Sequence, residues 1–305
     1  MFCLKFDQND KYLAVGAQNG QVQIYNIEQK KLLHLMRFPT VNQNMPITCL
    51  KWRPNIHNKT KDILVSVNAD GSIIHWHVPS GKPLHRMQEQ NQNSIMCLDY
   101  NEDGSQFATG GKDFHIRIYD DDTKSVIQDF GAADWNQTGH SNRVFSCKFI
   151  NNNILMSGGW DSNIILWDLR QKRNIGNIYG PSISGDSLDF KNDVILSGSY
   201  KNEHQIQLWD FKTLKLIKNI QWYENNSLNY QAYVYSSVFS KNNNDWILAG
   251  STRVNEVKIF RNKNQFECVG GIKDIKSCVY SVDFANFSNQ FAFCTADGRV
   301  YIYNM

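Results

Sequence analysis

Short runs in which apolar and polar residues alternate recur along the whole chain. At residues 21–25 and 115–119 every second residue is apolar, which is the period of a strand with one buried face. One such run ends in an aromatic residue and returns at intervals of roughly 41–49 residues. Its seven end points are Phe6, Trp52, Tyr100, Phe149, Phe190, Phe239 and Phe284. This period predicts seven copies of one repeat, with helix nearly absent.

Each copy continues in the same way, with a second apolar run, a tight turn and a third run closed by another aromatic residue. The turns carry small or polar residues that tolerate positive φ, such as Asn19-Gly20 and Asp70-Gly71. Copies one to six then have a fourth run, whereas the seventh stops at Met305. The sequence therefore predicts 27 strands in one all-β domain over residues 1–305.

The fourth copy carries a specific motif: Gly139-His140, Ser157, Asp161 and Trp167-Asp168. In these residues and in repeat length the chain resembles the WD40-repeat family. The resemblance implies a seven-bladed β-propeller with antiparallel blades. It also implies a buried relay in which Asp161 accepts from His140, and His140 and Ser157 connect to the Trp167 indole. Such a relay satisfies polar groups that cost about 1–3 kcal/mol each when buried unpaired.

The last blade is expected to have three strands. Family propellers usually close by lending an N-terminal strand to this blade, and no strand precedes Phe2 here. The edge at residues 300–303 is then unpaired, which soluble proteins generally cover. Two accounts remain open. A partner adds the strand by β-augmentation, or natural residues upstream of Met1 are missing.

Composition narrows the class of protein. The chain is 41% hydrophobic and 20% charged with a net charge of +3, which fits a globular protein and predicts neither a nucleic-acid nor a membrane-surface partner. It shows no run of about 18 apolar residues and no secretory signal pattern. Seven scattered cysteines favour reduced thiols. A cytoplasmic protein is expected.

The usual catalytic signatures are missing, among them a Gly-rich phosphate loop and Gly-x-Ser-x-Gly. Cys3, Cys49 and Cys97 share one repeat position where other copies have Ser, which indicates core packing rather than nucleophiles. The sequence therefore predicts no enzyme, no cofactor and no metal.

The resemblance implies that partners bind the narrow top face, through the residue before each turn Asp and the residues that start the innermost strands. Trp, Tyr and Arg at such places are typical of interface hot spots. Two longer insertions, at residues 131–142 and 222–232, add aromatic residues in polar loops. The predicted partner-binding residues are Trp160, Arg143, Lys112, Tyr233, Trp135, Trp222 and Tyr223.

These features favour a non-enzymatic scaffold that acts as a subunit of a larger protein assembly. The Asn-rich loops suggest an AT-rich genome such as that of a protist, which favours a cytoskeletal or ciliary setting. A reader of short acidic or modified peptides is one alternative, with Arg143, Lys112, Arg253 and Lys276 as a basic sector. A propeller enzyme or small-molecule binder that uses the central channel is the other.

Overall fold

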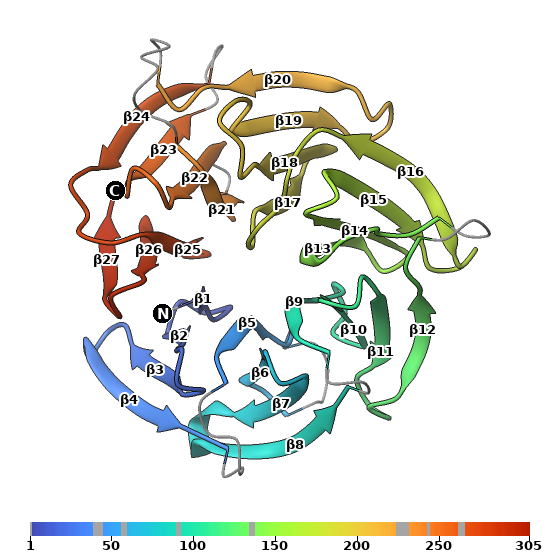
Figure 1. Cartoon of the computed structure of the whole chain (residues 1–305). Helices are drawn as coiled ribbons and strands as arrows, with labels where there is room; N and C mark the ends of the chain where they lie inside the picture. Colours follow the sequence, from blue (N-terminus) through green and yellow to red (C-terminus); the bar gives the residue numbers. More distant parts are fainter. Residues whose placement is uncertain are drawn as a thin grey trace.

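A computed structural model describes residues 2–38, 45–55, 60–89, 93–133, 138–223, 232–242, 245–261 and 266–305. Within these residues the chain forms 27 strands and one turn of 3-10 helix, η1 (Val78–Ser80). The strands build seven antiparallel sheets that stand round a central axis as the blades of a propeller (Figure 1). The predicted fold is confirmed, including the three-stranded last blade.

The strands of each blade run in sequence order from the axis to the rim. Blade 1 consists of β1 (Cys3–Phe6), β2 (Tyr12–Gly16), β3 (Val22–Asn26) and β4 (Lys31–Met36), and blade 2 of β5 (Ile47–Trp52), β6 (Ile63–Asn68), β7 (Ser72–His77) and β8 (Lys82–Gln88). Blade 3 consists of β9 (Ile95–Tyr100), β10 (Gln106–Gly111), β11 (Ile116–Asp120) and β12 (Val126–Phe130), and blade 4 of β13 (Val144–Asn151), β14 (Ile154–Gly159), β15 (Asn163–Asp168) and β16 (Arg173–Tyr179). Blade 5 consists of β17 (Leu188–Lys191), β18 (Val194–Gly198), β19 (Ile206–Asp210) and β20 (Leu216–Ile220), and blade 6 of β21 (Val234–Phe239), β22 (Trp246–Ser251), β23 (Val257–Arg261) and β24 (Glu267–Ile272). Blade 7 consists of β25 (Val279–Phe284), β26 (Gln290–Thr295) and β27 (Val300–Asn304).

The hydrophobic core lies between neighbouring blades. Second strands such as β2 and β6 are buried along their whole length, because another blade packs on each face. Outer strands such as β4 are mostly exposed and bury one residue near their end. One apolar cluster, for example, joins Ile24 and Met36 of blade 1 to Leu64 and Trp76 of blade 2. Burial of these surfaces, at about 25 cal/mol per Å², drives closure of the ring.

Polar contacts join blade 7 to blade 1, where β25 and β1 lie side by side (Figure 1). The Asp10 carboxylate accepts hydrogen bonds from all three backbone amides of residues 286–288, at 2.6, 2.7 and 3.0 Å. The Phe6 amide donates to the Asp283 carboxylate at 2.9 Å. The first and last blades are thus held together by side-chain acceptors, without a shared sheet in the described residues.

The outer edge of β27 is unpaired in the described part of the chain. Val300, which begins the third strand of blade 7, is partly exposed. Its six counterparts are all fully buried, and each pairs with a residue of a fourth strand: Val22 with Met36, Ile73 with Met87, Ile116 with Phe130, Ile164 with Ile178, Ile206 with Ile220 and Val257 with Ile272. Among the residues that the structure describes, no fourth strand completes the packing of blade 7 as it does in the other six blades.

Candidate protein-binding face

The four motif residues of blade 4 are linked by hydrogen bonds inside the protein. His140 Nδ1 lies 2.7 Å from Asp161 Oδ2, and His140 Nε2 lies 2.7 Å from Ser157 Oγ. The Trp167 indole N–H donates to the same Ser157 oxygen at 2.7 Å. His140, Ser157 and Trp167 are buried. Because solvent does not reach these groups, the relay holds the blade together and offers no surface to a partner.

Blade 3 forms a comparable network from different residues. Glu89 takes the place of the histidine, and its carboxylate accepts from Thr109 Oγ1 at 2.6 Å and from the Tyr119 hydroxyl at 2.9 Å. The Arg117 guanidinium donates to the other oxygen at 3.1 Å. Glu89 is buried too. Because a buried charge is costly without partners, Arg117 and these hydroxyl donors stabilise the Glu89 carboxylate.

Trp222, predicted to contact a partner, is instead buried, with 2% of its surface exposed. Its indole N–H donates to Glu256 at 3.0 Å, and its ring packs edge-on against Phe260. Tyr223, the residue after Trp222, is half-buried, and the Lys258 ammonium lies 4.0 Å above the Tyr223 ring. The expectation for Trp222 was wrong because the apolar environment of blade 6 and the Glu256 acceptor draw the indole inward.

Trp160 and Arg143 meet on one face of the ring, which we call the top face because it carries the turns between second and third strands. The Trp160 amide donates to the Arg143 carbonyl at 3.1 Å. The Arg143 guanidinium lies 5.5 Å above the Trp160 ring, and Phe145 packs against the same ring at 4.8 Å. The indole N–H donates to Ser184 at 2.8 Å. Trp160 is thus fixed by its neighbours and remains 44% exposed.

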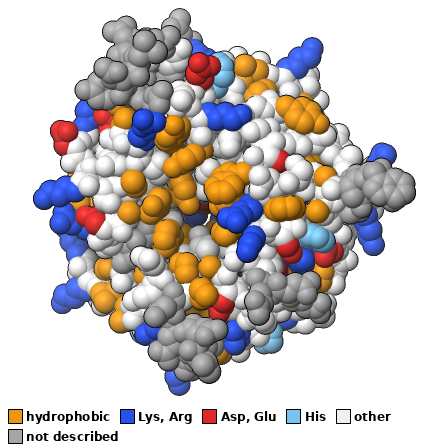
Figure 2. Space-filling model, in the orientation of Figure 1, with side chains coloured by type: hydrophobic (Ala, Val, Ile, Leu, Met, Phe, Trp, Pro, Cys, Tyr) orange, Lys and Arg blue, Asp and Glu red, His pale blue; other side chains and the backbone are white. Residues whose placement is uncertain are grey.

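Tyrosines continue this surface round the channel. Tyr200, 40% exposed, stacks on Tyr233 at 4.7 Å. Contacts between rings then pass from Tyr200 to Tyr235, from Tyr235 to Tyr280 and from Tyr280 to Phe2, across blades 5, 6, 7 and 1. Figure 2 shows hydrophobic side chains gathered round the central opening, with Lys and Arg beside them. We call the following residues the aromatic collar: Phe2, Phe145, Trp160, Tyr200, Tyr233, Tyr235 and Tyr280.

Three consecutive residues tie the two halves of the aromatic collar together. Ser184 holds Trp160, as described above, and Gly185 lies against Tyr235. A Cβ atom on Gly185 would lie 2.4 Å from the Tyr235 carbonyl oxygen and 2.5 Å from its ring, so only glycine fits there. Asp186 then reaches into the channel below. The segment 184–186 therefore fixes the spacing between the exposed rings.

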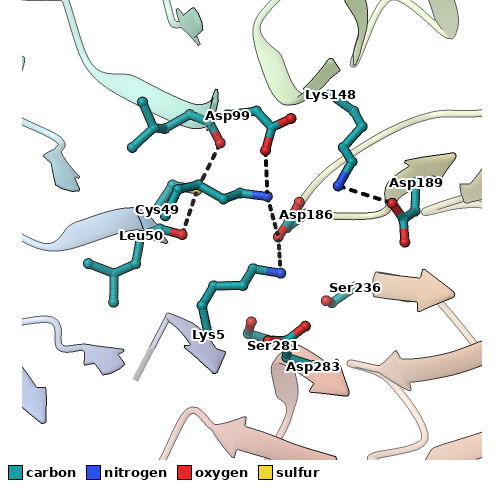
Figure 3. A network of polar contacts seen from close by, with 12 residues as sticks. Lys5, Cys49, Leu50, Asp99, Lys148, Asp186, Asp189, Ser236, Ser281 and Asp283 are labelled. Carbon is teal, nitrogen blue, oxygen red and sulfur yellow. Dashed lines mark hydrogen bonds and ion pairs between the residues drawn. The ribbon is translucent and has the colours of Figure 1, made fainter. Parts of the chain in front are cut away.

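Below the aromatic collar the channel is lined by charged residues (Figure 3). The Lys5 ammonium lies 2.7 Å from Asp186, which comes from another blade, and Lys51 lies 3.9 Å from the same carboxylate. Burial raises the pKa of Asp186, but the two ammonium groups outweigh burial and hold that pKa below its usual range. The whole charged set, which we call the channel ring, is Lys5, Lys51, Asp99, Lys148, Asp186, Asp189, Lys241 and Asp283.

The channel-binding alternative expects charged groups with shifted pKa values inside the channel, and the channel ring has them. A cavity of about 430 Å³ also opens at the ends of the inner strands. However, each lysine of the channel ring is already within 3.2 Å of a carboxylate. The Asp189 carboxylate, for example, raises the pKa of Lys148. These charges neutralise one another, which indicates a role in joining blades.

The remaining predicted residues lie as follows. Lys112 is exposed on the top face, where its amide donates to the Ser94 carbonyl at 2.9 Å, in the place that Trp160 has in blade 4. Tyr233 carries the Arg253 guanidinium above its ring at 5.4 Å. Trp135 lies outside the described residues.

The sequence interpretation missed most of the aromatic collar and the whole channel ring, although the repeat contains a signal for both. Phe2, Phe145, Tyr235 and Tyr280 each stand four residues before a strand-ending aromatic. The residue directly before that aromatic is charged in six of the seven copies: Lys5, Lys51, Asp99, Lys148, Asp189 and Asp283. Comparing the copies column by column would have found both layers of the channel.

Comparisons with known proteins agree with this architecture. Residues 81–120 and 134–168 match the family model of the WD domain, G-beta repeat, and residues 1–55 match that of the anaphase-promoting complex subunit 4 WD40 domain. The chain therefore carries WD40 repeats at these residues. A chain in the crystal structure of the mitotic checkpoint complex has the same fold, with a TM-score of 0.82 over 100% of this WD40 chain and 89% of that chain, at 15% identity.

Several curated proteins resemble the WD40 chain at low identity. WD repeat-containing protein slp1 of Schizosaccharomyces pombe is 22% identical over 71% of this chain and 42% of its own length. APC/C activator protein CDH1 of Saccharomyces cerevisiae is 24% identical over 67% and 34%. A periodic tryptophan protein 2 homolog of Dictyostelium discoideum is 22% identical over 98% and 30%. The chain thus spans less than half the length of each of these relatives.

Proposed function

We propose that this protein is a non-enzymatic subunit of a multiprotein assembly, and that it binds a partner through the aromatic collar and the arginines beside it. The observation that carries the proposal is Trp160, a large apolar side chain that is exposed yet held by Ser184, Phe145 and Arg143. Rigid exposed aromatics lose little conformational entropy on binding and dominate interface energies. A relative named as an activator of the APC/C supports a role in complexes.

The test is recovery of partners by the tagged protein from its own cells. The variant Trp160→Ala with Arg143→Ala removes the centre of the proposed surface. The matched control, Tyr179→Ala with Arg170→Ala, removes an aromatic residue that is 72% exposed and an arginine whose side chain is 68% exposed, both outside the aromatic collar. We expect the first variant to lose partners that the control retains. Equal recovery by both variants would remove the top-face proposal.

We further propose that β27 receives a fourth strand. Partial exposure of Val300, where six counterparts are buried, supports this, as does a cavity of about 330 Å³ between β24 and β27, lined by residues such as Val269 and Phe291. Hydrogen exchange of the β27 amides that point away from β26 would test it, measured on the isolated protein and on the complex purified from cells. Protection only in the complex is expected, and equally fast exchange in both contradicts it.

The cellular setting stays a prediction. None of the relatives named above is described as cytoskeletal or ciliary, so that setting gains no support from them.

In the part of the chain that the structure describes, no helix is long and apolar enough to cross a membrane. The seven cysteines are all unpaired, and burial raises the pKa of Cys49 to about 12, which makes its thiol a poor nucleophile at neutral pH.

A further inference from the structure

The outer edge of β27 offers its backbone to a further strand. The Met305 amide donates to the Asn289 carbonyl at 2.8 Å, in the same register that pairs β27 with β26. Because bonding alternates along an antiparallel strand, the odd-numbered residues bond to β26, and the amides of even-numbered residues such as Ile302 point away from it. Exposed edges are commonly protected by charged side chains. The outer strands of blades 1 to 6 each contain a charged residue, whereas residues 300–304 contain none, which favours a strand that covers this edge.

The six complete blades show which side chains a fourth strand brings. Its last paired residue is large and apolar, as described above for Met36 and its counterparts. Three residues earlier a β-bulge places two residues of the fourth strand opposite the closing aromatic residue of the third strand. The extra residue is aliphatic in all six blades: Leu33, Leu84, Ile127, Ile175, Ile217 and Val269. A strand that completes blade 7 in the same way therefore needs two apolar residues, three positions apart.

A third position follows from the way in which neighbouring blades touch at the rim. Leu214 stands six residues before the last paired residue of β20, and a Cβ atom on Gly176 of β16 would lie 2.4 Å from the Leu214 Cδ1. Phe266 stands at the same position before the end of β24, and the Lys218 ammonium of β20 lies 6.0 Å above its ring. Gly176 and Lys218 are each two residues before the last paired residue of their own strand. The residue six before the end of one fourth strand thus contacts the residue two before the end of the preceding one.

Blade 6 has a glycine at this contact. Gly270 is two residues before Ile272, the last paired residue of β24. Apart from its chain neighbours, no described residue has a heavy atom within 4 Å of the place where a Cβ on Gly270 would lie. The cavity of about 330 Å³ between β24 and β27 opens here, with Tyr303 in its wall (Figure 1). Because Gly176 accommodates Leu214 at the matching contact of blades 4 and 5, Gly270 leaves room for a similar side chain that arrives with an added strand.

We propose that a partner protein pairs with β27 through a segment that reads leucine, two residues, an aliphatic residue, two residues and a large apolar residue. The segment runs antiparallel to β27, as fourth strands do in the other blades. Its last residue packs opposite Val300, its middle aliphatic residue forms the bulge at Tyr303, and its leucine enters the cavity over Gly270. This inference rests on the proposed addition of a strand to β27, since it names the side chains that this strand carries. Main-chain bonds give such pairing its affinity, and the pockets for side chains give it specificity.

The probe is a fluorescein-labelled peptide with the sequence of residues 213–221, Thr-Leu-Lys-Leu-Ile-Lys-Asn-Ile-Gln, which carries the whole pattern. Its binding to the whole protein is measured by fluorescence anisotropy. One companion peptide has Ser at the three pattern positions. The other exchanges the last Ile with the Asn before it, which keeps the composition and turns the apolar side chain to the opposite face of the strand. We expect the parent peptide to bind at least tenfold more tightly than either companion, and equal affinity for either one overturns the proposal.

Variants of the protein show where the peptide binds. Gly270→Phe fills the cavity and should weaken binding of the parent peptide at least tenfold. Its control, Val126→Phe, enlarges a residue of the outer strand of blade 3 that is 48% exposed and should leave binding unchanged. Ile302→Pro removes an outward amide and should also weaken binding at least tenfold, whereas Ile302→Ala keeps that amide and should bind within threefold of wild type. Equal binding by Gly270→Phe and Val126→Phe overturns the placement, even if Ile302→Pro does not fold.

Other occupants of the β27 edge give different results. If light scattering shows that the isolated protein is a dimer, and Ile302→Pro makes it a monomer, a second copy covers β27 and the proposal is overturned. If the outward amides of β27 already exchange slowly in the isolated protein, residues of the same chain cover the edge, which also overturns the proposal.

This inference and the proposed strand addition fail in different ways. If the complex from cells protects the outward amides of β27 but the peptides do not discriminate, the added strand stands and the pattern is wrong. If the parent peptide binds selectively at Gly270 while the complex leaves those amides unprotected, the edge accepts a strand of this pattern. The inference about the site is then retained, and the strand addition proposed for the assembly falls.

Discussion

Replacing Asp186 by Asn tests whether the channel ring holds the propeller together. Asn keeps the size of the side chain and removes its charge. In the native protein this carboxylate lies 2.7 Å from Lys5 and 3.9 Å from Lys51, with 12% and 13% of those lysine side chains exposed. The substitution therefore leaves Lys5 buried without its ion-pair partner. Lys51 keeps Asp99 at 3.2 Å.

The expected loss follows from the cost of an uncompensated buried charge. Removing one partner of a buried ion pair costs about 3–5 kcal/mol. Because 23% of the Asp186 side chain is exposed, water compensates part of that cost, and we expect about 2–4 kcal/mol. With a urea dependence of about 2–3 kcal/mol per molar, the midpoint of unfolding should fall by roughly 1 M.

Urea unfolding followed by tryptophan fluorescence measures this change. The control is Asp193→Asn, which removes a carboxylate 2.6 Å from Lys212 at the surface, where the two side chains are 52% and 72% exposed. We expect no measurable change in the control, because exposed pairs contribute little. If both substitutions shift the midpoint equally, or Asp186→Asn shifts it by less than about 0.2 M, the channel ring does not stabilise the fold as argued.

The same pair predicts a dependence on pH. The folded-state pKa of Asp186 lies below the unfolded value of about 3.9, because Lys5 and Lys51 outweigh the opposing effect of burial. Its contribution to stability is therefore fully present above that value and is lost as pH falls towards the folded-state pKa. The difference in unfolding free energy between wild type and Asp186→Asn should be largest near pH 7 and shrink below about pH 4. A constant difference over this range contradicts the assignment.

Three further substitutions test other parts of the molecule. Asp10→Ala removes the acceptor of three amides at the junction of blades 7 and 1, and should cost about 1–2 kcal/mol in urea unfolding, whereas an unchanged midpoint contradicts the closure described here. Gly185→Ala brings a methyl group against the Tyr235 ring, so it should alter the near-ultraviolet circular dichroism and lower the melting temperature. Wild-type values of both would show that the segment 184–186 is not tightly packed. His140→Ala leaves Ser157 and Asp161 without their shared partner and should cost about 1–3 kcal/mol, while a negligible loss would show that the relay does not stabilise blade 4.

The fold could be predicted almost entirely from the sequence, because aromatic-ended strands recur with a constant phase along the whole chain. The three-stranded blade 7 could be predicted for the same reason, because the seventh copy has no fourth apolar run after its third strand. Trp160 and Arg143 could be placed on the top face from the repeat position alone.

The site was harder to predict because it depends on contacts between blades. The Asp186 carboxylate meets Lys5 only when blades far apart in the chain are wound into a ring. Trp222 was misplaced since its burial depends on Glu256, an acceptor 34 residues away that belongs to no motif. Tyr200 was overlooked because its role comes from stacking on Tyr233 of the next blade.

Site-specific photo-crosslinking in cells tests the central claim most directly. A photoreactive phenylalanine analogue is placed at Tyr200, in the aromatic collar, or at Phe287, which is 78% exposed. Phe287 follows the C-terminal end of the inner strand β25, whereas the aromatic collar lies at the N-terminal end of that strand. If the top face binds the partner, a defined polypeptide is crosslinked from position 200 and not from position 287. Crosslinking from position 287 alone, or the same product from both positions, would contradict the account.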